Sequence, residues 1–79
     1  MLEPKIISDT VNIGANIRAI RIKKGIKQTE LVAMVQLYNV NLTRETLVKI
    51  ESGRQHIKIS QLNAIKECLD VSYEDLLSK

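Results

Sequence analysis

The sequence is built from short segments in which isoleucine, leucine and valine recur three or four residues apart. That spacing follows one face of an α-helix, whereas a half-buried strand would alternate apolar and polar residues. In the first segment the apolar stripe consists of Ile13, Ile17 and Ile20. The pattern predicts a helix over residues 12–24, with Asn12 or Thr10 as its N-cap and Gly25 as its C-terminal stop.

A second helix is predicted over residues 28–36, although Lys27 at its N-cap position has no side-chain oxygen to accept a backbone hydrogen bond. The third helix has a stronger start signal. Thr43 is a favourable N-cap, and Leu42 and Leu47 stand at the positions of a hydrophobic staple.

The last third of the chain predicts two more helices. Ser60 is expected to cap the fourth, whose inward residues are Leu62, Ile65 and Leu69. Ser72 and Asp75 are spaced as a capping box for the fifth, in which Leu76 and Leu77 supply core or interface contacts. Five short helices without a convincing strand predict an all-α fold with helices packed at steep angles.

The size of the chain restricts what such a fold can do. Its 79 residues predict a single domain (1–79), with a helical core over 12–78 and an N-terminal arm over 1–11. There is no Phe or Trp, so the core is thin and leaves little room for a substrate pocket, which argues against an enzyme.

The sequence gives little support for a metal site, a redox-active cysteine or a membrane-spanning segment. One cysteine and one histidine cannot form the usual metal sites, so we expect neither metal nor cofactor. Cys68 is expected to be a buried apolar residue, with a redox switch as the alternative. No apolar run reaches about 20 residues and the N-terminus lacks a signal-peptide pattern, which predicts a cytoplasmic protein without a membrane partner.

The charge is unevenly distributed. Residues 16–58 carry nine Lys and Arg against three acidic residues, whereas residues 59–79 carry two against four. A basic middle segment suggests a face that meets a polyanion, although a merely solvated face would look similar.

The second and third predicted helices have the layout of a helix-turn-helix, in which the second member enters the DNA major groove. The polar face of that member, over about 43–52, comprises Arg44, Glu45, Val48 and Lys49. Arg and Lys can donate to guanine, Glu can accept from cytosine, and Val can touch a thymine methyl. Glu45 could instead orient a neighbouring cation.

Three stretches carry a family resemblance, namely the pattern from Ile13-Gly14 to Leu31, Leu42 to Arg54 with its Ile50-Glu51-Ser52-Gly53-Arg54 turn, and Leu69-Asp70-Val71-Ser72 to Leu77. They resemble the Cro/repressor-type (XRE, lambda-repressor-like) helix-turn-helix family. The resemblance covers roughly residues 12–78. It implies a compact five-helix domain that binds double-stranded DNA, usually as a homodimer on a palindromic operator.

The resemblance also implies roles for individual residues. Arg44, Glu45 and Lys49 become base-reading candidates, and Arg21 and Glu51 a structural ion pair between the first and third helices. The phosphate-contacting candidates are Gln28, Thr29, Thr43, Arg54, His56 and Lys58.

The chain departs from the family pattern in four places. The segment 36–42 is about five residues longer than in short members, which could bring Tyr38 and Asn39 near DNA or a partner. Val32 replaces a small alanine, Lys27 replaces the capping Ser or Thr, and no proline follows the third helix.

These observations predict a sequence-specific transcriptional regulator, a repressor that acts as a homodimer without catalysis. The alternative is a protein-interaction module on the same fold, such as an antitoxin or a protein that binds another regulator, with little DNA specificity.

Overall fold

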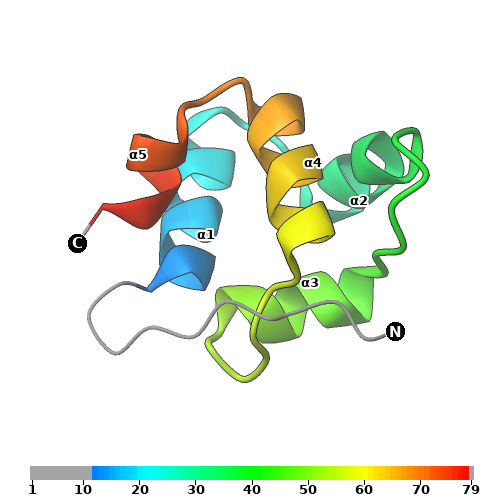
Figure 1. The fold of residues 1–79 in the computed structure, drawn as a ribbon, viewed down its shortest axis with the longest axis horizontal. Helices are drawn as coiled ribbons and strands as arrows, with labels where there is room; N and C mark the ends of the chain where they lie inside the picture. The colour runs from blue at the N-terminus through cyan, green and yellow to red at the C-terminus, as the bar shows by residue number, and fades with distance from the viewer. Residues whose placement is uncertain (1–11, 79) are drawn as a thin grey trace.

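The computed structural model describes residues 12–78, and these residues form five helices and no strand (Figure 1). The helices are α1 (Ile13–Lys23), α2 (Gln28–Gln36), α3 (Arg44–Glu51), α4 (Ile59–Leu69) and α5 (Tyr73–Leu77). The predicted all-α class is therefore confirmed, whereas the arm predicted over residues 1–11 lies outside the described residues. None of the helices within 12–78 is long and apolar enough to cross a membrane.

Side-chain caps begin three of the helices, as their sequences predicted. The Asn12 side chain accepts a hydrogen bond from the backbone of Ala15 at 2.9 Å, and Thr43 Oγ1 accepts one from Thr46 at 3.1 Å. At α5, Ser72 and Asp75 bond reciprocally at 3.1 and 3.2 Å. The hydrogen bond from the Ser72 backbone N–H lowers the pKa of the Asp75 carboxyl below its ordinary value.

The predicted N-cap of the fourth helix is wrong by two residues. Helix α4 begins at Ile59, so Lys58 occupies the N-cap position and Ser60 lies inside the first turn. The buried Gln61 side chain accepts from the Lys58 backbone N–H at 3.0 Å. Helix α2 begins in the same way, since Glu30 accepts from the Lys27 N–H at 2.9 Å. In both helices the side chain of the third helical residue thus accepts a hydrogen bond from the backbone N–H of the N-cap residue. The lysine at the N-cap has no side-chain oxygen that could accept one.

The core is aliphatic throughout. Helix α1 packs against α3 and α5, and α2 packs against α3 and α4. Helix α3 therefore contacts both α1 and α2. The side chains with less than 2% exposure are Ile17, Leu31, Val35, Leu42, Leu47, Ile50, Ile65, Leu69 and Leu76. Leu76 therefore belongs to the core, whereas Leu77 is 40% exposed. Cys68 packs against this core but is only partly buried, less than predicted.

Helices α1 and α3 approach each other closely at Gly14. A Cβ atom on Gly14 would overlap the carbonyl oxygen of Ile50 and lie 2.7 Å from its carbonyl carbon. Because both are backbone atoms, they cannot move aside as a flexible side chain would. Glycine is therefore required here for helix packing rather than for an unusual backbone angle.

The longer connection between α2 and α3 is ordered by hydrogen bonds at its C-terminal end. Gln36 Nε2 donates to the Leu42 carbonyl at 3.0 Å, and Gln61 Nε2 donates to the Asn41 carbonyl at 3.1 Å. Leu42 is buried, whereas Leu37 and Tyr38 are 85% and 53% exposed. The extension therefore holds the start of α3 in place and projects two apolar side chains into solvent.

Candidate nucleic-acid interface

Helices α2 and α3 are consecutive and in contact, and α3 divides cleanly into two faces. Leu47 and Ile50 are buried, so the opposite face points away from the core. Among the predicted base-reading residues, Arg44 and Glu45 are exposed, and Val48 and Lys49 are half-buried. The polar face of α3 is thus available to a partner along its first and second turns.

Two of these residues form an ion pair with each other. Lys49 Nζ lies 3.6 Å from Glu45 Oε1, one helical turn away, and the Glu45 side chain is 83% exposed. An exposed pair of this kind adds only about 0.3–0.5 kcal/mol to stability. Its main effect is to hold the Lys49 ammonium over the first turn of α3. This arrangement matches the orienting role considered for Glu45.

A buried network lies behind this face. Arg21 and Glu51 form a bidentate ion pair, with Nε to Oε2 at 2.7 Å and Nη2 to Oε1 at 2.9 Å. Glu51 also accepts from Gln28 Nε2 at 3.1 Å, and Arg21 Nη1 donates to the carbonyl of Ile26 at 2.9 Å. Arg21 is 8% exposed and Glu51 5%. The network joins α1, the start of α2 and the end of α3.

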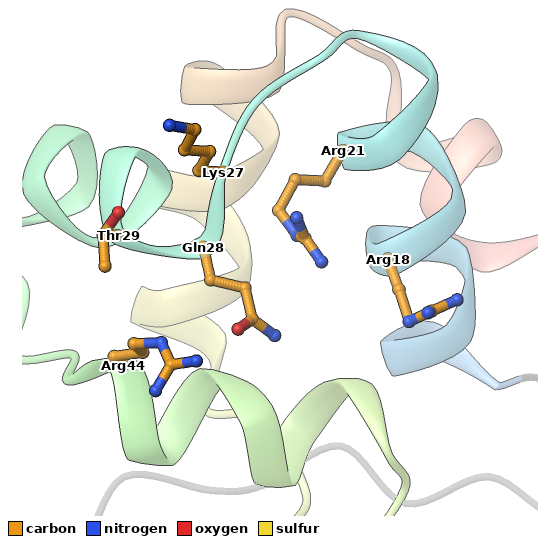
Figure 2. Close-up of a pocket in the computed structure, with 6 residues that line it drawn as sticks. All are labelled: Arg18, Arg21, Lys27, Gln28, Thr29 and Arg44. Atoms are coloured by element: carbon orange, nitrogen blue, oxygen red, sulfur yellow. The ribbon is translucent and has the colours of Figure 1, made fainter.

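An open hollow of about 480 Å³ lies above this network (Figure 2). The six residues that line it are Arg18, Arg21, Lys27, Gln28, Thr29 and Arg44. It brings together the predicted residues Gln28, Thr29 and Arg44, which come from two helices. Four of the six lining residues are cationic and none is acidic, so the hollow is suited to an anion.

The start of α2 adds to this positive character. Its N-cap residue Lys27 makes no side-chain cap hydrogen bond, so the first-turn N–H groups lack a cap acceptor. Such a helix start carries a partial positive charge and attracts phosphate groups. Thr29 is exposed in this first turn, and its hydroxyl can also donate to an anion.

The remaining phosphate-contacting candidates lie elsewhere. Arg54, His56 and Lys58 follow the end of α3, whereas Arg44 is its first residue. Arg54 and His56 are exposed, and Arg54 Nε donates to Ser52 Oγ at 3.0 Å. The Thr43 hydroxyl caps α3, so a phosphate would have to share it.

Arg18 and Lys27 line the hollow but were not among the predicted site residues. A sequence signal for Arg18 exists, because it lies three residues before Arg21 and therefore on the same face of α1. Lys27 was considered only as a poor N-cap. The sequence could not show that its side chain lines the hollow. Figure 2 shows Lys27 at the start of α2.

The comparisons with known proteins agree with this architecture. A helix-turn-helix family model matches residues 17–76. The restriction-modification controller protein C.AhdI from Aeromonas hydrophila aligns with 90% of this chain and 100% of its own, at 22% identity and a TM-score of 0.74. The clp gene regulator ClgR from Corynebacterium glutamicum aligns with 92% of this chain and 71% of its own, at 23% identity and a TM-score of 0.74.

A hypothetical transcription factor, NHTF from Neisseria, aligns with 96% of this chain and 86% of its own, at 25% identity and a TM-score of 0.71. No curated protein sequence matches the chain. At these identities the solved structures of C.AhdI and ClgR support the fold alone.

Proposed function

The chain belongs to the Cro/repressor-type (XRE) helix-turn-helix family, and on that basis we propose that it regulates transcription by binding specific sequences in double-stranded DNA. The solved neighbours are described as a restriction-modification controller, a gene regulator and a transcription factor. Their descriptions support the same class of function for this chain.

One observation carries the proposal beyond the family. The exposed polar face of α3 lies beside a cationic hollow at the start of α2. Helix α3 is narrow enough to enter a major groove about 12 Å wide, and the hollow can then meet the adjoining phosphates. An all-lysine face would bind phosphate without selectivity, whereas this face combines donors, an acceptor and an apolar side chain.

We assign base reading to the outward side chains of α3. Arg44 and Lys49 donate to guanine, and Val48 contacts a thymine methyl. Glu45 accepts from cytosine or holds Lys49 in position, as the ion pair between them favours. The phosphate contacts come from Gln28 and Thr29 at the start of α2, together with Thr43 and the residues after α3, which are Arg54, His56 and Lys58.

The mode of action we propose is repression by a homodimer. Two copies related by a two-fold axis would place their α3 helices in successive major grooves on one side of the duplex. That geometry requires an inverted repeat with half-sites about 10 base pairs apart. Bound across a promoter, such a dimer would exclude RNA polymerase.

The deciding experiment is selection of bound duplexes from a random pool at about 150 mM salt, where phosphate attraction alone is weak. We expect an inverted repeat. Arg44→Ala and Lys49→Ala should then relax selection at individual base pairs by about 1–3 kcal/mol each. Lys24→Ala, at the far end of α1, is the control and should leave the selected sequence unchanged.

Sedimentation of the selected complex measures the number of chains per duplex, and two are expected. Recovery of no motif would refute the proposal. The protein-interaction module would then become the better description, and the exposed Leu37 and Tyr38 would be the first surface to test for a partner.

A further inference from the structure

Arg18 is the one hollow-lining cation on the outer surface of α1, a helix outside the α2–α3 pair. Its side chain is exposed, and no carboxylate among residues 12–78 forms an ion pair with it. Figure 2 shows Arg18 and Arg44 on either side of Gln28. The fold therefore brings a cation from α1 to the same hollow as the start of α3, 26 residues later.

The charges around the hollow are only partly compensated. Glu51 neutralises Arg21 through their bidentate pair, which lies beneath the surface. The cations of Arg18, Lys27 and Arg44 remain, together with the partial positive charge at the start of α2. Three uncompensated cations from three helix segments around one open hollow are complementary to a single phosphodiester group.

We infer that Arg18 on α1 is a further DNA-contact residue, which donates to the backbone phosphate that the proposed function places at this hollow. The inference rests on the proposed function, since the phosphate belongs to the duplex that α3 reads. A contact from α1 would hold the protein to the DNA backbone at a point outside the α2–α3 pair. Such backbone contacts fix the orientation of a protein on the duplex without reading its sequence.

The salt dependence of binding tests the inference directly. Each phosphate neutralised by a protein cation contributes about 0.9 to the slope of log K against log salt. Arg18→Gln should lower the slope by that amount and weaken binding roughly eight-fold at about 0.1 M salt, which is the same slope converted to affinity. Arg18→Lys retains the charge and should keep the slope.

The matched control is Lys23→Gln, which removes one positive charge from the same helix. Lys23 lines a separate hollow with Asp75, away from the proposed phosphate. Lys23→Gln should leave the slope of log K against log salt unchanged. Binding is measured in chloride on a selected duplex and on a mixed-sequence duplex. The loss with Arg18→Gln should be equal on both, because a phosphate contact does not read bases. Thermal melting checks that each variant is folded.

The outcomes separate the inference from the proposed function. If the wild-type protein fails to bind either duplex, the proposed function fails. If it binds and Arg18→Gln behaves like Lys23→Gln, the function stands and the inference is overturned. A third arm adds inorganic phosphate at constant ionic strength. If phosphate raises the melting temperature of the wild type but not of Arg18→Gln, while both bind DNA equally, the hollow holds a free anion and the inference is again overturned.

Discussion

Replacing Glu51 by glutamine tests the buried network most directly. The substitution preserves the size of the side chain but removes the negative charge opposite Arg21. In the native protein that carboxylate accepts two hydrogen bonds from Arg21 and one from Gln28, at 2.7, 2.9 and 3.1 Å. In Glu51→Gln the guanidinium stays buried with an amide in place of its counter-charge. The carbonyl of Ile26 remains as its second acceptor.

The size of the effect follows from burial. Removing one partner of a buried ion pair costs about 3–5 kcal/mol, because the other charge is left uncompensated. Glu51 is the last residue of α3, where a negative charge opposes the helix dipole, so its removal returns about 0.3–1 kcal/mol. A chain of 79 residues has a total stability of about 4–12 kcal/mol. The net loss is therefore a large fraction of the whole.

Thermal unfolding followed by circular dichroism measures the loss. A change of 1 kcal/mol shifts the melting temperature of a domain this size by about 4–8 °C, so Glu51→Gln should lower it by at least about 8 °C. Glu45→Gln is the matched control, since Glu45 is on the same helix and also pairs with a cation, but in solvent. It should cost no more than about 1 kcal/mol.

A double variant, Arg21→Met with Glu51→Met, completes the comparison. Replacing a buried pair by apolar residues of similar volume is often neutral or stabilising, so the double variant should melt higher than Glu51→Gln. If Glu51→Gln and Glu45→Gln melt within 2–3 °C of each other, their stabilities differ by less than about 1 kcal/mol. That result would contradict the prediction that losing a buried counter-charge costs more than losing an exposed one.

Three further predictions concern packing, capping and thiol chemistry. Gly14→Ala should destabilise by about 1–3 kcal/mol or more in chemical denaturation, because its Cβ overlaps the backbone of Ile50; an unchanged midpoint would contradict the close approach. Gly25→Ala is the comparison, because an added Cβ there meets no neighbour although φ is +71°. It should lower the stability only by the strain of an alanine in the left-handed conformation, about 1–2 kcal/mol. Thr43→Ala removes the cap of α3 and should cost about 1 kcal/mol, seen as a melting temperature about 4–8 °C lower; a melting temperature equal to that of the wild type would refute the capping role. Burial raises the pKa of the Cys68 thiol, so iodoacetamide should alkylate it more slowly at pH 8 than it alkylates glutathione, with a rate midpoint at higher pH; equal rates would show that the thiol is open to solvent.

The helices could be predicted closely from the sequence because their ends carry local chemical signals. Asn12, Thr43 and Ser72 are caps whose partners lie three residues further on. Such signals need no knowledge of the tertiary structure. Helix α4 was misplaced because Ser60 is a strong cap residue by type, while the group that satisfies the N-terminal donor is Gln61. The hydrogen bond from the Lys27 backbone N–H to Glu30 was also missed, because only the N-cap side chain was considered there.

The hollow could not be predicted, because periodicity identifies the buried face of a helix but not which exposed residues converge. That convergence depends on how steeply α1, α2 and α3 cross, and the crossing is set by packing contacts such as Gly14 against Ile50. In sequence, Gly14 is only an unfavourable residue in a helix. In the structure it permits the close approach of α1 to α3 that brings Arg18 and Arg44 to one hollow.

The buried pair and the hollow are parts of one arrangement. Glu51 bonds both Arg21 and Gln28, so a single core carboxylate positions two of the six residues that line the hollow. Residues held in place before binding lose little conformational freedom on binding, which favours affinity. The double methionine variant therefore separates the two roles of the pair. It should remain folded, because apolar side chains fill the space, yet bind DNA more weakly, because Gln28 has lost its acceptor. A folded double variant with unchanged DNA affinity would mean that Glu51 stabilises the fold without positioning the interface.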